Sequence, residues 1–137
     1  MTRFRKTLIV DDDVASQFLL RVVLDELGLN IPIIALANGQ EALDYIRQQC
    51  INENAASAEC PDWILLDINM PVMDGLELLS CLEALGQDNQ IASAVTVVTS
   101  SNYSKDMEKA TALGVKAYLL KPVTEEKLRE HLDNHFG

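Results

Sequence analysis

Five short apolar runs, each closed by a polar residue and followed by a helical pattern, organise the chain. The predicted strands are residues 8–10, 33–37, 63–66, 95–98 and 117–120. Apolar residues then recur at helical spacing, and the predicted helices cover residues 15–27, 42–46, about 75–85, about 105–113 and about 124–136. Strand and helix therefore alternate from one end of the chain to the other.

Near-continuous apolar strands joined by helices are typical of a parallel sheet that is covered on both faces. The predicted fold class is α/β, a doubly wound five-stranded parallel sheet. Right-handed crossovers with a single topological switch favour the strand order 2-1-3-4-5, with ligands bound beyond the carboxyl ends of the strands. The length of 137 residues fits one domain, 1–137. Residues 48–61 exceed a usual connection and are interpreted as an exposed insertion.

Polar residues stand at the ends of four of these strands. Asp11 and Asp12 follow the first, Asp67 the third, Thr99 the fourth and Lys121 the fifth. A parallel sheet brings these ends to one rim, where three carboxylates repel one another unless a cation lies among them. Carboxylate ligands without nearby His or Cys favour Mg²⁺ over Zn²⁺, and Mn²⁺ could replace Mg²⁺.

Each of these residues also has a structural interpretation. Asp13 and Asp74 stand where they would cap helices, and we give them no chemical role. One helix needs only one cap, so capping does not explain Asp11 and Asp12 together. Lys121 taken alone could be a solvated surface lysine, and a threonine at a strand end is ordinary. The chemical interpretation depends on their joint occurrence.

Composition narrows the function. Apolar residues make up 48% and charged residues 23%, as in an average globular protein. The 21 acidic and 11 basic residues give a net charge of -10, which disfavours binding to nucleic-acid phosphates. Aromatic residues make up only 5%, too few for a base-stacking surface. No apolar run approaches the ~20 residues that span a bilayer, and the first residues do not form a signal peptide. We expect a soluble cytoplasmic protein without membrane or nucleic-acid partners.

The cysteines and histidines carry weaker signals. Three cysteines without C-x-x-C spacing predict reduced thiols, although a Cys50–Cys60 pair is conceivable. His131 and His135 lie four residues apart on the last predicted helix, but no third metal ligand is evident. We interpret both histidines as solvated, or as complementing the helix dipole.

Four segments resemble the motifs of one family in the same order. Residues 67–79 read DINMPVMDGLELL, and residues 10–12, 98–100 and 118–122 read VDD, VTS and YLLKP. The chain resembles the response-regulator receiver domain of two-component signalling, of the single-domain chemotaxis-regulator kind, from about residue 6 to 136. The resemblance implies a flavodoxin-like three-layer sandwich and phosphoacceptor signalling in a phosphorelay.

The resemblance also implies roles at the rim. Asp67 would accept the phosphoryl group, and Asp12, Asp67 and the backbone carbonyl of Asn69 would bind Mg²⁺. Asp11 would act through metal-bound water. Lys121 would contact the phosphoryl oxygens. These roles fit phosphoryl transfer, which depends on positioning and charge neutralisation.

The resemblance further implies a switch. The Thr99 hydroxyl would move inward and donate a hydrogen bond to the phosphoryl oxygens, and Tyr118 would take up the vacated space. The peptide bond between Lys121 and Pro122 would be cis. The surface of helix 4, strand 5 and helix 5 would change, and a target protein would bind it. Ser101 and Asn69 occupy positions that influence the lifetime of the acyl phosphate.

The implied donor is a phosphohistidine of a sensor histidine kinase or histidine phosphotransfer protein, and the chain would not be an enzyme beyond self-phosphorylation and self-dephosphorylation. Two alternatives remain. A degenerate receiver would bind proteins as an unphosphorylated scaffold. A phosphatase with an aspartyl nucleophile would need an acid where Asn69 stands, and an amide cannot transfer that proton.

Overall fold

The computed structural model describes residues 4–51, 60–85 and 94–135. Its five strands are β1 (Thr7–Val10), β2 (Ile33–Leu36), β3 (Trp63–Leu66), β4 (Val95–Thr99) and β5 (Ala117–Leu120). They pair in parallel in the order β2-β1-β3-β4-β5, which confirms the predicted fold class and strand order.

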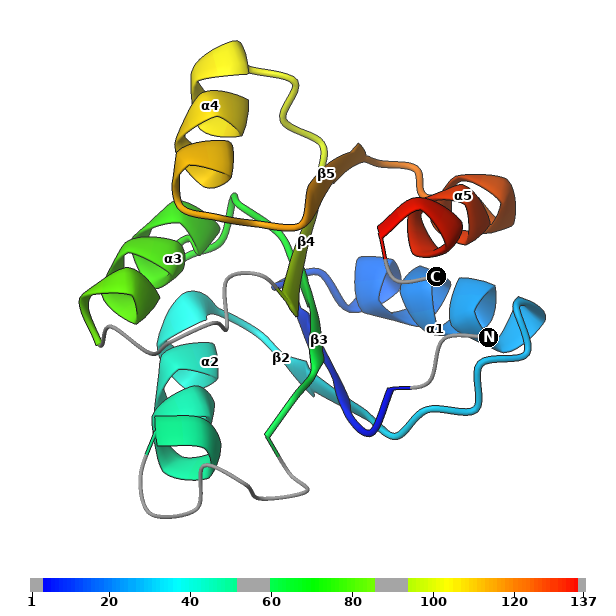
Figure 1. Cartoon of the computed structure of the whole chain (residues 1–137), viewed down its shortest axis with the longest axis horizontal. Coiled ribbons are helices and arrows are strands. Elements are labelled where there is room, and N and C mark those ends of the chain that lie inside the picture. Colours follow the sequence, from blue (N-terminus) through cyan, green and yellow to red (C-terminus); the bar gives the residue numbers. More distant parts are fainter. Residues whose placement is uncertain (1–3, 52–59, 86–93, 136–137) are drawn as a thin grey trace.

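Helices cover both faces of the sheet. They are α1 (Val14–Glu26), α2 (Gly39–Ile46), the π-helical turn η1 (Arg47–Ile51), α3 (Gly75–Ala84), α4 (Ser104–Ala112) and α5 (Glu125–His135). In Figure 1, α1 and α5 lie on one side of the sheet, and α2, α3 and α4 lie on the other. The three-layer arrangement is confirmed. Within the described ranges, every helix is too short or too polar to cross a membrane.

Each strand contributes side chains to two hydrophobic cores, one on each face of the sheet. Successive side chains of a strand point to opposite faces, so Leu8 and Val10 pack toward α2 and α3 while Ile9 packs toward α1 and α5. All three side chains are fully buried. This two-sided burial explains why the strands are apolar without alternation, and it leaves polar residues to the strand ends.

Side-chain caps begin four of the helices, and at α5 the Thr124 hydroxyl accepts the Lys127 N–H at 3.1 Å. Asp13 accepts the Ala15 N–H at the start of α1, and Asn38 accepts the Glu41 N–H at the start of α2. Asp74 and Glu77 form a reciprocal capping box at the start of α3. The predicted capping roles of Asp13 and Asp74 are confirmed.

The expectation of three reduced thiols was wrong for two of them. The helical path continues beyond α2 through η1, so the predicted insertion begins with helical residues rather than a loop. The η1 turn places Cys50 next to Cys60, with 5.1 Å between their Cα atoms. The two cysteines form a disulfide. Cys81 is free. Residues 52–59, which make up most of the predicted insertion 48–61, lie outside the described residues.

The interpretation of His131 as a solvated side chain was also wrong. Leu128, His131 and Leu132 lie on one face of α5 and are all buried, and His131 is 4% exposed. Its Nε2 lies 2.7 Å from Thr96 Oγ1, which also accepts the Trp63 Nε1–H at 3.1 Å. Trp63, Thr96 and His131 thus form a buried polar chain from β3 through β4 to α5.

Burial also changes the ionisation of His131. Removal from water, with smaller contributions from His135 and Lys116, lowers its pKa to about 4. The imidazole is therefore neutral at pH 7. It lies against His135 with ring centroids 5.0 Å apart.

Candidate functional site

Three carboxylates meet at the carboxyl ends of β1 and β3. One oxygen each of Asp11, Asp12 and Asp67 lies within 4.8 Å of the others. The backbone fixes two of them: the Asp11 N–H donates to Leu36 O, and the Asp67 N–H donates to Val10 O. These bonds extend the parallel ladders by one residue. Asp11 is 2% exposed and Asp67 7%, whereas Asp12 is exposed.

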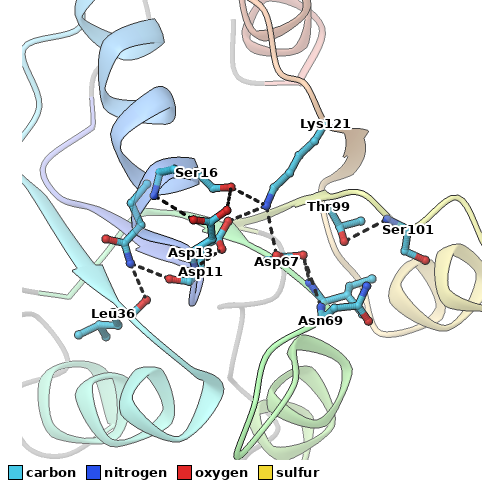
Figure 2. Close-up of polar contacts among 12 residues, drawn as sticks. Asp11, Asp13, Ser16, Leu36, Asp67, Asn69, Thr99, Ser101 and Lys121 are labelled. Atoms are coloured by element: carbon cyan, nitrogen blue, oxygen red, sulfur yellow. Dashed lines mark hydrogen bonds and ion pairs between the residues drawn. The ribbon is translucent and has the colours of Figure 1, made fainter.

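Lys121, directly after β5, brings a positive charge to these carboxylates. Its Nζ donates to Asp11 Oδ2 at 2.8 Å and to Asp67 Oδ2 at 3.2 Å (Figure 2). A third hydrogen bond goes to Ser16 Oγ on α1, at 3.2 Å. The Lys121–Pro122 peptide is cis, as the resemblance implied. Asp11, Asp12, Asp67 and Lys121 form a cluster that we call the rim.

Burial and charge act against each other at the rim. Burial raises the pKa of Asp11, and the hydrogen bond from Lys121 only partly opposes it. For Lys121, burial lowers the pKa, but the hydrogen bond to Asp11 and the charge of Asp67 outweigh burial and leave it raised. The ammonium is therefore kept protonated by the carboxylates that it joins.

The donor set of the rim fits a divalent cation. Three carboxylates against one ammonium leave two negative charges, which one divalent ion would neutralise. All the candidate ligand atoms are oxygens, the ligands that Mg²⁺ prefers. Exposed Asp12 leaves the cluster open to solvent on one side, as an ion that keeps several waters requires.

The backbone orients the Asp67 side chain. Its Oδ1 accepts the Ile68 N–H at 2.7 Å and the Asn69 N–H at 3.4 Å, so Oδ2 faces Lys121. The start of α3 abuts the same backbone: the Gly75 N–H donates to Ile68 O, and a Cβ on Gly75 would collide with the Asp67 carbonyl oxygen. The role predicted for the Asn69 carbonyl stays a prediction.

Hydrogen bonds tie Thr99 to the loop that follows β4. The buried Thr99 Oγ1 accepts the Ser101 N–H at 3.3 Å, and the half-buried Tyr118 donates its hydroxyl to Ser101 O at 2.9 Å. Ser101 Oγ donates to Asp106 Oδ2 at 2.8 Å. We call Thr99, Ser101, Asp106 and Tyr118 the β4–α4 latch. It joins the end of β4 to α4 and β5.

Three residues that support the rim or the β4–α4 latch were not predicted from the sequence. Ser16 holds Lys121, Gln17 donates to the Asp11 carbonyl oxygen at 2.6 Å, and Asp106 anchors Ser101. Ser16 and Gln17 are polar residues in the first turn of α1. That position was the available signal, because the start of α1 follows directly from the end of β1.

Comparison with known proteins decides the family. Residues 7–133 match the response regulator receiver domain. The chain belongs to this family. The receiver domain is 32% identical over 126 residues to the probable methanogenesis regulatory protein FilR2 of Methanothrix harundinacea, a match covering 92% of this chain and 77% of that protein.

Solved structures agree. The bacteriophytochrome response regulator AtBRR matches with a TM-score of 0.77 and 28% identity, covering 98% of this chain and 94% of that one. The Mn(2+)-bound form of response regulator Rcp1 matches with a TM-score of 0.74 and 27% identity, covering 96% and 93%. Other curated relatives are much longer: this chain spans 53% of a transcriptional regulatory protein and 7% of a hybrid signal transduction histidine kinase.

The structure thus brings together the acidic residues and the lysine that the sequence predicted at the strand ends. Thr99 ends the neighbouring strand β4, and Tyr118 reaches it through the shared partner Ser101.

Proposed function

We propose that this receiver domain accepts a phosphoryl group on Asp67 from a phosphohistidine of a sensor histidine kinase or a histidine phosphotransfer protein. The observation that carries the proposal is the Lys121 ammonium, 2.8 Å from Asp11 and 3.2 Å from Asp67. An anionic group arriving beside carboxylates needs such a compensating charge. The proposal places the chain in the cytoplasm, where kinases draw on ATP.

In the transfer step, a carboxylate oxygen of Asp67 forms a P–O bond while the P–N bond to the donor imidazole breaks. The bonding pair leaves with the imidazole nitrogen. Backbone N–H groups hold Asp67 Oδ1, so the carboxylate is oriented before the donor arrives. Lys121 stands against Oδ2, where its ammonium can contact phosphoryl oxygens.

The metal belongs to the same proposal. Asp12, Asp67 and the Asn69 carbonyl would hold Mg²⁺ directly, with Asp11 acting through a coordinated water. Bound there, Mg²⁺ supplies positive charge beside the phosphoryl oxygens, and Mn²⁺ shares its preference for octahedral oxygen ligands. The oxygen-only donor set supports this assignment.

The output would be binding of a protein. The Thr99 hydroxyl would donate a hydrogen bond to a phosphoryl oxygen, and the β4–α4 latch would carry the change to Tyr118. The face of α4, β5 and α5 suits a protein target, because β5 is a half-exposed edge strand and a groove of about 470 Å³ lies over it. Met107, Tyr118 and Leu120 contribute to that groove. The net charge of -10 disfavours a nucleic-acid target.

A phosphorylation assay tests the proposal. The full chain is incubated with Mg²⁺ and acetyl phosphate, and intact mass is followed for wild type, Asp67→Asn and Asp13→Asn. Asp13 is not one of the four rim residues, and asparagine can keep both the cap of α1 and a hydrogen bond with Ser16 Oγ, which makes it the matched control. We expect one phosphoryl group on wild type and Asp13→Asn, none on Asp67→Asn, and none with chelator present.

Other outcomes point elsewhere. Equal labelling of wild type and Asp67→Asn would contradict the assignment of the acceptor. Failure to bind Mg²⁺ or a phosphoryl mimic would favour an unphosphorylated scaffold, and sustained turnover of phosphate monoesters would favour a phosphatase.

The output face has its own test. Amide hydrogen exchange is compared with and without beryllofluoride, a phosphoryl mimic. We expect protection to change in residues 100–120 and in α5 while α2 stays unchanged. A change confined to the rim would contradict the proposed output.

A further inference from the structure

A disulfide lies at the end of the sheet opposite the rim. Cys50 is the penultimate residue of η1, and Cys60 lies three residues before the start of β3. The neighbouring Asp62 accepts the backbone N–H groups of Arg5 and Lys6, so this approach to β3 is anchored independently of the sulfur atoms. Four strand residues at about 3.3 Å each separate the start of β3 from Asp67, roughly 13 Å. The rim takes no part in this pair.

The two cysteine residues differ in exposure. Cys50 is 9% exposed and belongs to the core that α2 and α3 share, whereas Cys60 is half-buried at its margin. An external disulfide therefore reaches Cys60 first. Cys50 is placed to complete the reaction from the protein side.

We propose that Cys50 and Cys60 form a reversible thiol–disulfide pair, which gives this receiver domain a redox input separate from the rim. The reversibility of the pair rests on the proposed function, because that function places the chain in the reducing cytoplasm. Disulfides that form in this compartment are mostly transient or redox-sensing. A permanent crosslink is not needed for stability, because a domain of 137 residues buries enough surface without one.

The exchange balances with a low-molecular-weight disulfide such as glutathione disulfide as the oxidant. The Cys60 thiolate attacks one sulfur of that disulfide and displaces a thiolate, which leaves a mixed disulfide. The Cys50 thiolate then attacks the Cys60 sulfur and displaces the second thiolate. The two cysteines lose two electrons and two protons, and the oxidant becomes two thiols. A dithiol reverses both steps.

The bond fixes the end of η1 to the start of β3. Closing a short loop restricts the unfolded chain, so oxidation should raise the melting temperature by about 5 to 15 °C in a domain of this size. Because the rim is remote, labelling of Asp67 by acetyl phosphate should change by less than about twofold.

Thiol counting tests the proposal on the full, folded chain. The protein is reduced, freed of reductant and exposed to glutathione disulfide; it is then quenched in acid, denatured and alkylated, and its mass is measured. We expect reactive thiols to fall from three to one, and dithiothreitol to restore all three without unfolding. Cys81→Ser is the matched control and should still close the pair, whereas Cys60→Ser and Cys50→Ser should not.

Several results would overturn the proposal. They are a bond that forms only in denaturant, a bond to Cys81, glutathione remaining on Cys60, or a bond that dithiothreitol opens only on unfolding. If Cys50→Ser does not fold, Cys60→Ser alone decides, because its site lies at the margin of the core. Thiol counts and phosphoryl labelling are separate masses, so failure of either proposal is seen without the other.

Discussion

The rim and the buried polar chain are two ways of placing polar side chains in the same sheet. At the carboxyl end, Asp11 and Asp67 are buried around Lys121, and negative charge stays in excess. On the α5 side of the sheet, the chain passes from Trp63 through Thr96 to His131, with neutral groups at pH 7.

The rim and the buried polar chain differ in whether their charges are balanced. The Thr96 hydroxyl accepts a hydrogen bond from Trp63 and can donate one to His131, and the three groups carry no net charge at pH 7. The rim retains charge that only an added cation would neutralise. Burial of polar groups therefore does not by itself mark a functional site. We expect changes at the rim to alter chemistry most, and changes in the buried polar chain to alter stability most.

The largest expected effect is on chemistry, from Lys121→Gln. Removing a charge aimed at the transferring group should slow labelling by acetyl phosphate about 100- to 1,000-fold. Mg²⁺ should bind more tightly, because the carboxylates lose their competing cation. Mass spectrometry and calorimetry measure the two effects, with exposed Lys109→Gln on α4 as the control. An unchanged rate would remove Lys121 from the mechanism.

A comparably large effect on stability is expected from Thr96→Val. The change keeps the shape but removes the hydroxyl that joins Trp63 and His131, and should cost about 2 to 4 kcal/mol in the free energy of unfolding. Urea denaturation measures it. Thr111→Val, at an exposed position of α4, should cost little. Loss of phosphorylation in folded Thr96→Val would break the distinction drawn above.

An intermediate effect is expected from acid. The pKa of His131 is about 4 when folded and near its usual 6.5 when unfolded, so the unfolded chain binds the extra proton between these values. Stability from this group is fully present above pH 6.5 and is lost as pH falls toward 4. Between pH 7 and 5 we expect a loss of about 2 kcal/mol.

Two variants isolate that contribution. Urea titrations across the pH range should show a shallower slope for His131→Gln than for wild type. His135→Gln, which removes the neighbouring imidazole, should retain most of the slope. Identical slopes for wild type and His131→Gln would assign the acid sensitivity to the carboxylates.

The smallest expected effect concerns the β4–α4 latch. Ser101→Ala removes the hydrogen bond to Asp106, worth about 1 kcal/mol, so amide exchange in residues 100–106 should rise up to about fivefold. Ser80→Ala, at an exposed position of α3, is the control. Unchanged exchange would show that Tyr118 holds the loop without Ser101 Oγ.

Local sequence patterns predicted the strands, most of the rim and two helix caps. Apolar runs located the strands, and the convergence of parallel strand ends predicted that Asp11, Asp67 and Lys121 lie together, as the structure shows. Those inferences needed only periodicity and topology. They also recovered the caps at Asp13 and Asp74, which depend on neighbours in sequence.

The missed features depend on the rotation of a helix about its axis. His131 lies three residues after Leu128 and one before Leu132, so the phase of the apolar residues could have indicated its burial. The Ser16 contact with Lys121 joins residues 105 apart in sequence. The Cys50–Cys60 bond depended on a π-helical turn that apolar spacing does not reveal.

Gly75 leaves no space for a methyl group against the Asp67 carbonyl oxygen, so the first residue of α3 packs directly against the backbone of the residue that carries a rim carboxylate. A screen of all twenty amino acids at position 75 should return glycine alone if it selects for labelling at Asp67. Any selection for folding alone should be more permissive, because the helix can recede. The difference between the two sets of tolerated amino acids would measure how closely the Asp67 carboxylate must be held for labelling.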